Sequence, residues 1–262
     1  MAKKHSKEKD MVLDISKPVR HLVESFKIIF KNYKLFLPLM IVAAVLGGVS
    51  LGVSDDAWVI IMVLVILMLW LATLIVLRHL SAGKEISFRD AIYNAMGPII
   101  PTLIVLVVLL AECIPIFLLI IGYSSAVETN LFGNVFYGSI FVLVALGLVA
   151  VSAFFVTSSL MGLVAVSVPG TYPVEALMLS SEMMKGRKMK MFLRLLILVL
   201  MMLVIWLVVM VPVGLIQNVT GWQIVGGGVF VLGCFSVVYV ATYLYLYYRW
   251  LLNDERARYD KK

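Results

Sequence analysis

The chain contains six runs of mostly apolar residues that are long enough to cross a lipid bilayer. A transmembrane helix needs about 20 such residues to span roughly 30 Å of hydrocarbon. The runs cover residues 35–53, 57–77, 99–121, 135–168, 191–216 and 222–250. They predict an all-α, polytopic membrane protein with six transmembrane helices.

The composition leaves little room for anything else. Hydrophobic residues make up 63% of the 262 residues and charged residues 14%, against about half and a quarter in soluble domains. No stretch remains that could build a large extramembrane enzyme domain. We therefore expect one membrane domain at 18–250 between charged tails at 1–17 and 251–262. We also expect no cleaved signal peptide, because no short apolar core directly follows the charged N-terminus.

The basic residues lie on one side of this predicted topology. With the N-terminus inside, the inside segments hold 9, 3, 5 and 5 lysines and arginines, which are all 22 in the chain. These segments are residues 1–34, 78–98, 169–194 and 249–262. Because positive charge resists translocation, the asymmetry predicts that both termini lie in the cytoplasm. The net charge of +7 then reflects topology and attraction to anionic lipid, without nucleic acid as a partner.

Three inside segments, 18–34, 87–96 and 173–185, have the helical alternation of apolar and polar residues that is typical of amphipathic helices. Each precedes a pair of spans, and such helices can lie in the plane of the membrane surface. In the first, we expect four basic residues to bind the anionic inner leaflet. They are Arg20, Lys27, Lys31 and Lys34.

The first two of these segments resemble each other. Ser25-Phe26-Lys27 corresponds to Ser87-Phe88-Arg89, and Asn32 and Asn94 each follow seven residues after the serine. The pattern suggests three copies of a unit made of one interfacial helix and two spans. A chance likeness between amphipathic helices explains it equally well, so both interpretations stay open.

Glu112 is the sharpest candidate for a functional group, because a carboxylate in hydrocarbon is costly. Pro115 follows closely and leaves the carbonyl of Ala111 without its helical donor. Glu112 either binds a proton or cation on a transport pathway, or reaches water near the outer boundary. The hydroxyls that could join it are those of Ser152, Thr157, Ser158 and Ser159 in the fourth run. Such hydroxyls also bond their own helix backbone or join helices.

Other chemistry finds no support in the motifs. Tyr239, Tyr243 and Tyr247 share one helix face, which indicates either a ligand-stacking stripe or, as we favour, helix packing. No nucleophile motif, phosphate loop or metal-ligand spacing is present. We therefore expect no catalytic, cofactor or metal site.

Two groups of residues carry a resemblance to a known family. The first is Leu80-Ser81-Ala82-Gly83 with Ala91, Pro98 and Pro101, and the second is Ala176-Leu177, Ser180, Gly186-Arg187 and Phe192. In these segments the chain resembles multi-span bacterial and archaeal proteins related to the membrane domain of glycerophosphoryl diester phosphodiesterase. The resemblance implies six spans and no known chemistry. Since only twelve residues follow Trp250, we expect no counterpart of the soluble catalytic barrel of the anchored diesterases.

These observations predict a non-enzymatic protein of the cytoplasmic membrane with a structural, scaffold or lipid-associated role. Its expected partners are the lipids of the anionic inner leaflet, and a second copy or another membrane protein is left open. The alternative is a small transporter or permease component that uses Glu112 and the hydroxyls of the fourth run.

Overall fold

The computed structural model describes residues 16–50, 55–128, 135–168, 170–220 and 225–259, and within these ranges every regular element is a helix. This confirms the predicted all-α class. In chain order the helices are α2 (Ser16–Lys31), α3 (Tyr33–Ser50), α4 (Asp55–Ser81), α5 (Phe88–Ala95), α6 (Ile99–Glu112), α7 (Ile114–Glu128), α8 (Val135–Ser159), α9 (Gly162–Ala165), α10 (Pro173–Met183), α11 (Lys188–Thr220) and α12 (Val225–Tyr259). Most of the predicted tail at 1–17 lies outside the described ranges.

Four helical stretches are long and apolar enough to cross a membrane. They are Ala57–Ser81, Phe136–Ala165, Lys188–Gln217 and Gly226–Asp254. Two bent pairs also qualify when each is taken as one span: α2 meets α3 at 87°, and α5 meets α6 at 63°. The described residues thus contain four to six candidate spans, as a membrane-embedded protein requires.

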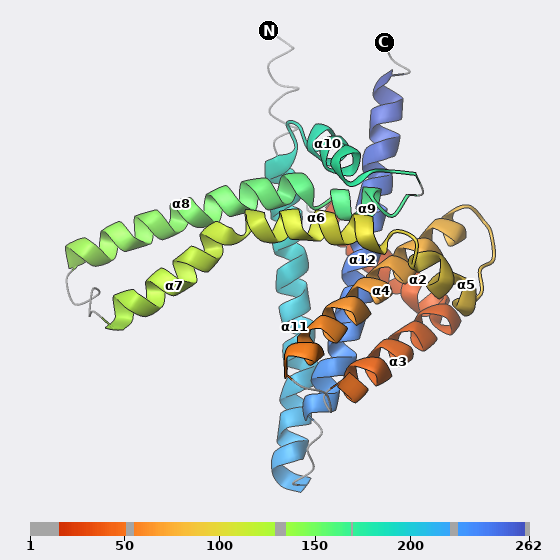
Figure 1. The fold of residues 1–262 in the computed structure, drawn as a ribbon, viewed down its shortest axis with the longest axis horizontal. Helices are drawn as coiled ribbons and strands as arrows, with labels where there is room; N and C mark the ends of the chain where they lie inside the picture. Colours follow the sequence, from red (N-terminus) through yellow and green to blue (C-terminus); the bar gives the residue numbers. More distant parts are fainter. Residues whose placement is uncertain (1–15, 51–54, 129–134, 169, 221–224, 260–262) are drawn as a thin grey trace.

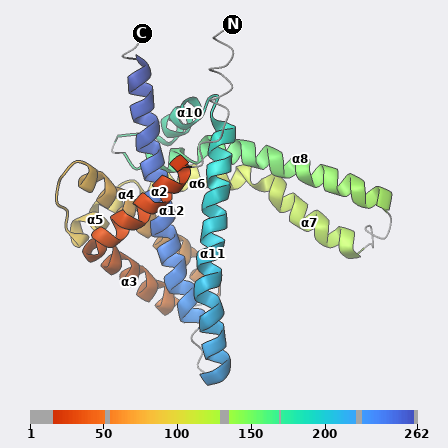
Figure 2. The same cartoon turned by 180° about the vertical axis from the view of Figure 1, so that it is seen from behind.

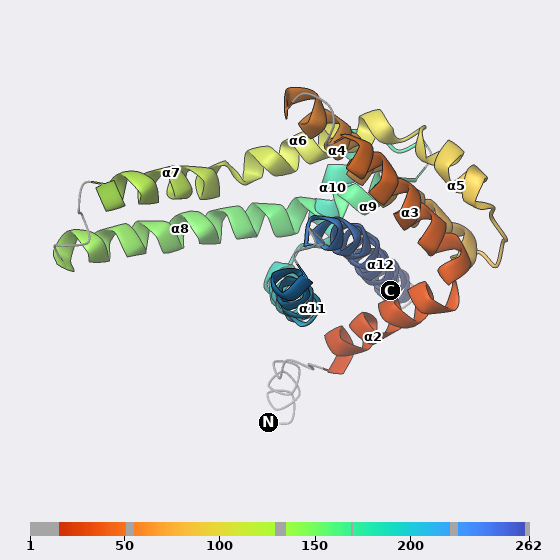
Figure 3. The ribbon, with the colours of Figure 1, turned by 90° about the horizontal axis from the view of Figure 1, so that it is seen from below.

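Two long helical hairpins point in different directions from a shared centre (Figures 1 and 3). One is the hairpin of α11 and α12. The other is the hairpin of α7 and α8, the α7–α8 arm, which projects sideways from the first. On the other side of α12, helices α3 and α4 pack against it and against each other, as Figure 2 shows from behind. The main core lies here, where Phe36, Leu71 and Leu244 are almost fully buried.

The α7–α8 arm and α11 leave large apolar side chains uncovered. Leu143 and Leu146 of α8 are 69% and 63% exposed, and Val208 of α11 is 66% exposed. Continuous apolar surface of this extent is unusual on water-soluble monomers. Lipid or another apolar surface must therefore cover these helices.

The structure interrupts two of the predicted apolar runs and extends the last helix beyond its predicted end. The third run breaks into α6 and α7 at Cys113, where Pro115 lies in the first turn of α7 and has no backbone N–H to continue the helix. The fourth run breaks after Ser159, and the short α9 follows. Helix α12 continues to Tyr259, so most of the predicted tail at 251–262 is helical.

The two serines that suggested a repeated unit occupy different structural positions. Ser25 lies inside α2 and donates to the carbonyl of His21 (2.8 Å). Ser87 precedes α5 and caps it, because its hydroxyl accepts from the backbone N–H of Asp90 (3.2 Å). The residue-by-residue correspondence is therefore wrong at these positions. The two segments share only a short helix, a bend and a longer apolar helix.

Helix α2 packs against α12 through part of its apolar face. The hydroxyl of Tyr239 donates to the carbonyl of Leu22 (3.0 Å), and the rings of Phe26 and Tyr239 lie 4.6 Å apart. On the opposite side, Arg20, Lys27 and Lys31 are exposed, together with the apolar Val23 and Phe30. The break at Asn32 places Lys34 in α3. Binding of these cations to lipid stays a prediction.

Candidate functional site

Glu112 forms a polar contact between two helices. It is the last residue of α6, and its Oε1 accepts a hydrogen bond from the hydroxyl of Ser159 at the end of α8 (2.5 Å). Its second oxygen, Oε2, is buried and makes no hydrogen bond. The structure therefore brings Glu112 and Ser159 together, and their bond joins α6 to α8 at the base of the arm.

The other hydroxyls that the sequence singled out do not reach Glu112. Thr157 donates to the carbonyl of Ala153 in its own helix (2.6 Å). The hydroxyl of Ser152 is buried without a partner. Ser158 accepts through its backbone carbonyl from the hydroxyl of Ser180 in α10 (2.5 Å). These three residues lie within α8 and form no shared polar cluster with the Glu112 carboxylate.

The tyrosine stripe on α12 is part of the packed interior. Tyr239 and Tyr243 are fully buried, and Tyr247 is 1% exposed. These values agree with helix packing, which the spacing by four residues also allowed. Tyr239 and Tyr243 therefore offer no accessible surface on which a ligand could stack, whereas Tyr247 lies at the edge of a pocket.

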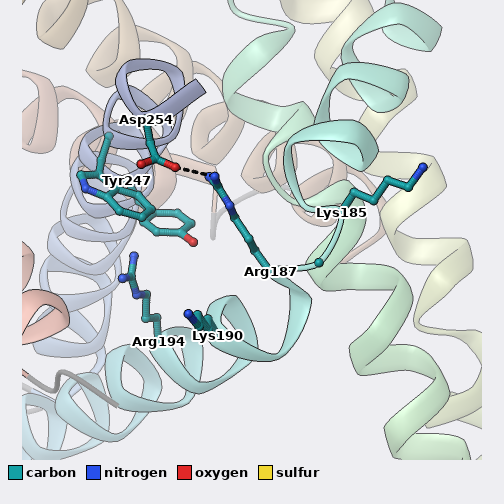
Figure 4. A pocket seen from close by; sticks show the side chains of 8 residues that line it. Lys185, Arg187, Lys190, Arg194, Tyr247 and Asp254 are labelled. Atoms are coloured by element: carbon teal, nitrogen blue, oxygen red, sulfur yellow. Dashed lines mark hydrogen bonds and ion pairs between the residues drawn. The ribbon is translucent and has the colours of Figure 1, made fainter. Parts of the chain in front are cut away.

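A basic pocket opens where α11 begins and α12 ends, and Figure 4 shows its side chains. Its volume is about 340 Å³, within the roughly 300–1,000 Å³ that is common for small-molecule sites. The residues that line it are Lys185, Gly186, Arg187, Lys190, Arg194, Tyr247, Trp250 and Asp254. We refer to this set as the basic pocket.

The local chain geometry gathers the cations of the basic pocket. Gly186 has a φ of 75°, a left-handed conformation that lets the chain turn sharply between α10 and α11. Arg187 therefore lies directly before the first residue of α11. Lys190 and Arg194 are four residues apart and share one face of that helix. In Figure 4, Lys185 points away from the other cations.

Two stacked aromatic rings hold the arginines in place. The rings of Tyr247 and Trp250 lie 5.7 Å apart at 17°. The guanidinium carbon of Arg194 is 4.7 Å from the centre of the Tyr247 ring and 5.0 Å from that of Trp250. Arg187 lies 6.0 Å from the Trp250 ring. Such cation–π contacts fix the orientation of a guanidinium group.

The basic pocket has more hydrogen-bond donors than acceptors. Nη2 of Arg187 forms an ion pair with Oδ2 of Asp254, the one carboxylate among four lining cations. Nη1 of Arg187 and Nη1 of Arg194 are both buried and have no hydrogen-bond partner. Buried donors of this kind are costly and call for an explanation. The arrangement is chemically suited to an anion.

Sequence reasoning missed the basic pocket because its parts are far apart in the chain. Arg187 and Asp254 are separated by 67 residues. In the sequence, Arg187 counted only toward the topology and the family resemblance, and Asp254 was assigned no role. A signal was present in Asp254, which follows the aromatic Trp250 by one helical turn and Tyr247 by two. It lies at the same predicted membrane surface as the basic segment 185–194. No known family model matches the chain, and no curated protein or solved structure is significantly similar to it.

Proposed function

We propose that the chain is a non-enzymatic, six-span protein of the cytoplasmic membrane with a lipid-associated role, and that both termini lie in the cytoplasm. The observation that carries this proposal is the separation of charge along the α11–α12 hairpin. Residues 195–220 and 225–248 contain no charged side chain, whereas the opposite end of the hairpin holds the basic pocket. At about 1.5 Å per residue, these uncharged stretches exceed the roughly 30 Å of a hydrocarbon layer.

The contacts of α12 support placing the inner surface of the membrane near Tyr245. The hydroxyl of Tyr245 donates to that of Ser81 at the end of α4 (3.1 Å), so the two helices share this level. Residues 225–245 of α12 measure about 30 Å as a helix, which matches the hydrocarbon thickness. Helix α2 contacts α12 at Tyr239, about 9 Å before Tyr245 along the helix. Its exposed cations suit a helix close to an anionic surface.

The remaining spans complete the proposed topology. Helices α3 and α4 form the first pair of spans. In the second pair, α6 together with α7 forms one span and α8 forms the other. Helices α11 and α12 form the third pair. Each pair follows one of the short helices α2, α5 and α10. We also keep as a proposal the kinship with the membrane domain of the phosphodiesterase-related family, which implies the same six spans.

A labelling experiment tests the topology. In a background with Cys113 and Cys234 replaced by alanine, we expect a cysteine at Glu128 to react with an impermeant maleimide in intact cells. Cysteines at Lys84 and Lys185 should react only after permeabilisation, since basic segments stay inside. All three native residues are exposed, so accessibility within the protein is matched. Reaction at Lys84 in intact cells would overturn the orientation.

A second candidate function is transport of protons or small cations through Glu112. The observation that favours it is the buried Oε2 atom without a hydrogen-bond partner beside the Ser159 contact. An ionisable side chain inside a membrane-spanning segment is by default a candidate for an ion pathway. Glutamine at this position keeps the size and the acceptor for Ser159 but removes the charge.

Proteoliposomes with a trapped pH-sensitive dye test this candidate. Under an imposed membrane potential, the native protein should carry protons faster than Glu112→Gln, by at least about threefold. Ser159→Ala keeps the carboxylate and should retain most of the flux. If all three preparations are as tight as protein-free vesicles, Glu112 has only the structural role of joining α6 to α8.

A further inference from the structure

We propose that the basic pocket binds the phosphate group of an anionic ligand, with the headgroup of an inner-leaflet phospholipid as its source in the membrane. This inference rests on the proposed function for its position at the cytoplasmic surface. The chemistry itself depends only on the side chains that line the pocket. A soluble phosphate ester has the same chemistry and is the second source that the experiment must separate.

Two arginines in the basic pocket have buried hydrogen-bond donors that lack acceptors. The side chain of Arg187 is 13% exposed, and the Nη1 atoms of both Arg187 and Arg194 are buried without an acceptor. Figure 4 shows the two guanidinium groups on either side of the Tyr247 hydroxyl. A phosphate offers several oxygens on one small group, so it can accept from both arginines at once.

Both arginines are held in place before any anion binds. The rings of Tyr247 and Trp250 already hold Arg194 at 4.7 Å and 5.0 Å from their centres, and Asp254 holds Arg187 by an ion pair. Little side-chain entropy is therefore lost when an anion binds. Arginine also matches the geometry of phosphate oxygens through two parallel N–H groups, which a lysine cannot do.

The basic pocket carries an excess of positive charge. Three of the lining cations, Arg187, Lys190 and Arg194, lie together against the single carboxylate of Asp254, whereas Lys185 points away (Figure 4), which leaves an excess of two positive charges. This excess favours a multiply charged phosphate monoester over a singly charged carboxylate. Lys190 is exposed at the rim, where it can contribute to attraction without being part of the buried contact.

The position of the basic pocket along the α11–α12 hairpin also suits a lipid headgroup. If the hydrocarbon layer ends near Tyr245, Tyr247 and the adjacent Arg194 lie about half a turn of helix beyond it, where the layer of lipid headgroups begins. Basic pockets between transmembrane helices on the cytoplasmic side are suited to phosphorylated headgroups. The pocket opens between α11 and α12 at this end of the hairpin (Figure 4).

The test uses the full-length protein and three variants. Arg194→Gln removes a buried donor, and Lys190→Gln removes a charge at the rim. Arg249→Gln is the matched control, because it removes one exposed arginine at the same end of α12 but does not line the pocket.

In the lipid arm, native mass spectrometry counts phosphatidic acid retained from mixed vesicles of phosphatidylcholine and phosphatidic acid. In the soluble arm, thermal unfolding in detergent is followed with added inorganic phosphate, with chloride of equal ionic strength as reference.

We expect phosphatidic acid to bind the native protein and Arg249→Gln within about twofold of each other. Arg194→Gln should bind it at least about tenfold more weakly, because a hydrogen bond to a charged group is lost. Lys190→Gln should show a smaller loss of about fivefold, which keeps the test valid if Arg194→Gln unfolds. A different result is that inorganic phosphate stabilises the native protein but phosphatidic acid is not selectively retained. This result would support the phosphate site and assign it to a soluble ligand.

Two outcomes would overturn the inference. One is the absence of both lipid retention and stabilisation by phosphate. The other is an equal loss in Arg194→Gln and Arg249→Gln, which would show attraction to surface charge without a defined site. Neither outcome changes the labelling pattern at Glu128, Lys84 and Lys185, so failure of the pocket and failure of the topology are distinguishable.

Discussion

Replacing Tyr239 by alanine should lower the free energy of unfolding by about 3–5 kcal/mol, as is typical when a large buried aromatic side chain is removed. Tyr239 is fully buried and lies 4.6 Å from the Phe26 ring and 6.0 Å from the Phe235 ring, measured between centroids. Its hydroxyl donates to the carbonyl of Leu22 (3.0 Å). Alanine leaves a cavity between α2 and α12 and also removes the donor for that carbonyl.

Two further variants separate these contributions. Tyr239→Phe keeps the ring and removes only the hydroxyl, so it should cost about 1 kcal/mol. Tyr93→Ala removes a tyrosine that is 77% exposed on α5 and should change stability by less than about 0.5 kcal/mol. Reversible unfolding in mixed micelles by added denaturing detergent measures all three. If Tyr239→Ala and Tyr93→Ala cost the same, α2 does not pack on α12 as described.

The fold class could be predicted from the sequence because it follows from apolar runs and helix lengths, which are local properties. The ranges 57–77 and 191–216 fall within α4 and α11, and they differ from them by a few residues at each end. The break at Cys113 was also readable, because Pro115 removes a backbone donor at a fixed distance along the chain. Its consequence, the separate direction of α7, depends on packing and could not be predicted.

The candidate sites show the same division between local and long-range information. Glu112 was found because a carboxylate in an apolar run is conspicuous by itself. The basic pocket was missed because it needs Arg187 and Asp254, which only the fold brings together across 67 residues. Likewise, the apolar face of α2 predicted burial, but periodicity does not distinguish lipid from the surface of α12. Leu22 faces α12, whereas Phe30 remains 65% exposed.

The arm formed by α7 and α8 provides the sharpest test of the six-span proposal. Leu146 lies near the middle of α8 and is 63% exposed. If α8 crosses the hydrocarbon, Leu146→Arg places a charge near the bilayer centre and raises the apparent free energy of insertion by about 3–4 kcal/mol. This corresponds to a decrease of roughly two orders of magnitude in the insertion equilibrium.

Glycosylation of an acceptor site in a lengthened 129–134 segment, assayed in microsomes, reports whether the α7–α8 hairpin has inserted. Tyr137→Arg is the matched control, since Tyr137 is 53% exposed at the start of the same helix and a long arginine there can reach the headgroups. Glycosylation should fall strongly in Leu146→Arg and little in Tyr137→Arg.

Because the arm projects sideways from α11–α12 (Figure 1), the competing arrangement is an arm covered by another protein outside the hydrocarbon. In that case the segment is never translocated, and both variants remain unglycosylated like the native chain.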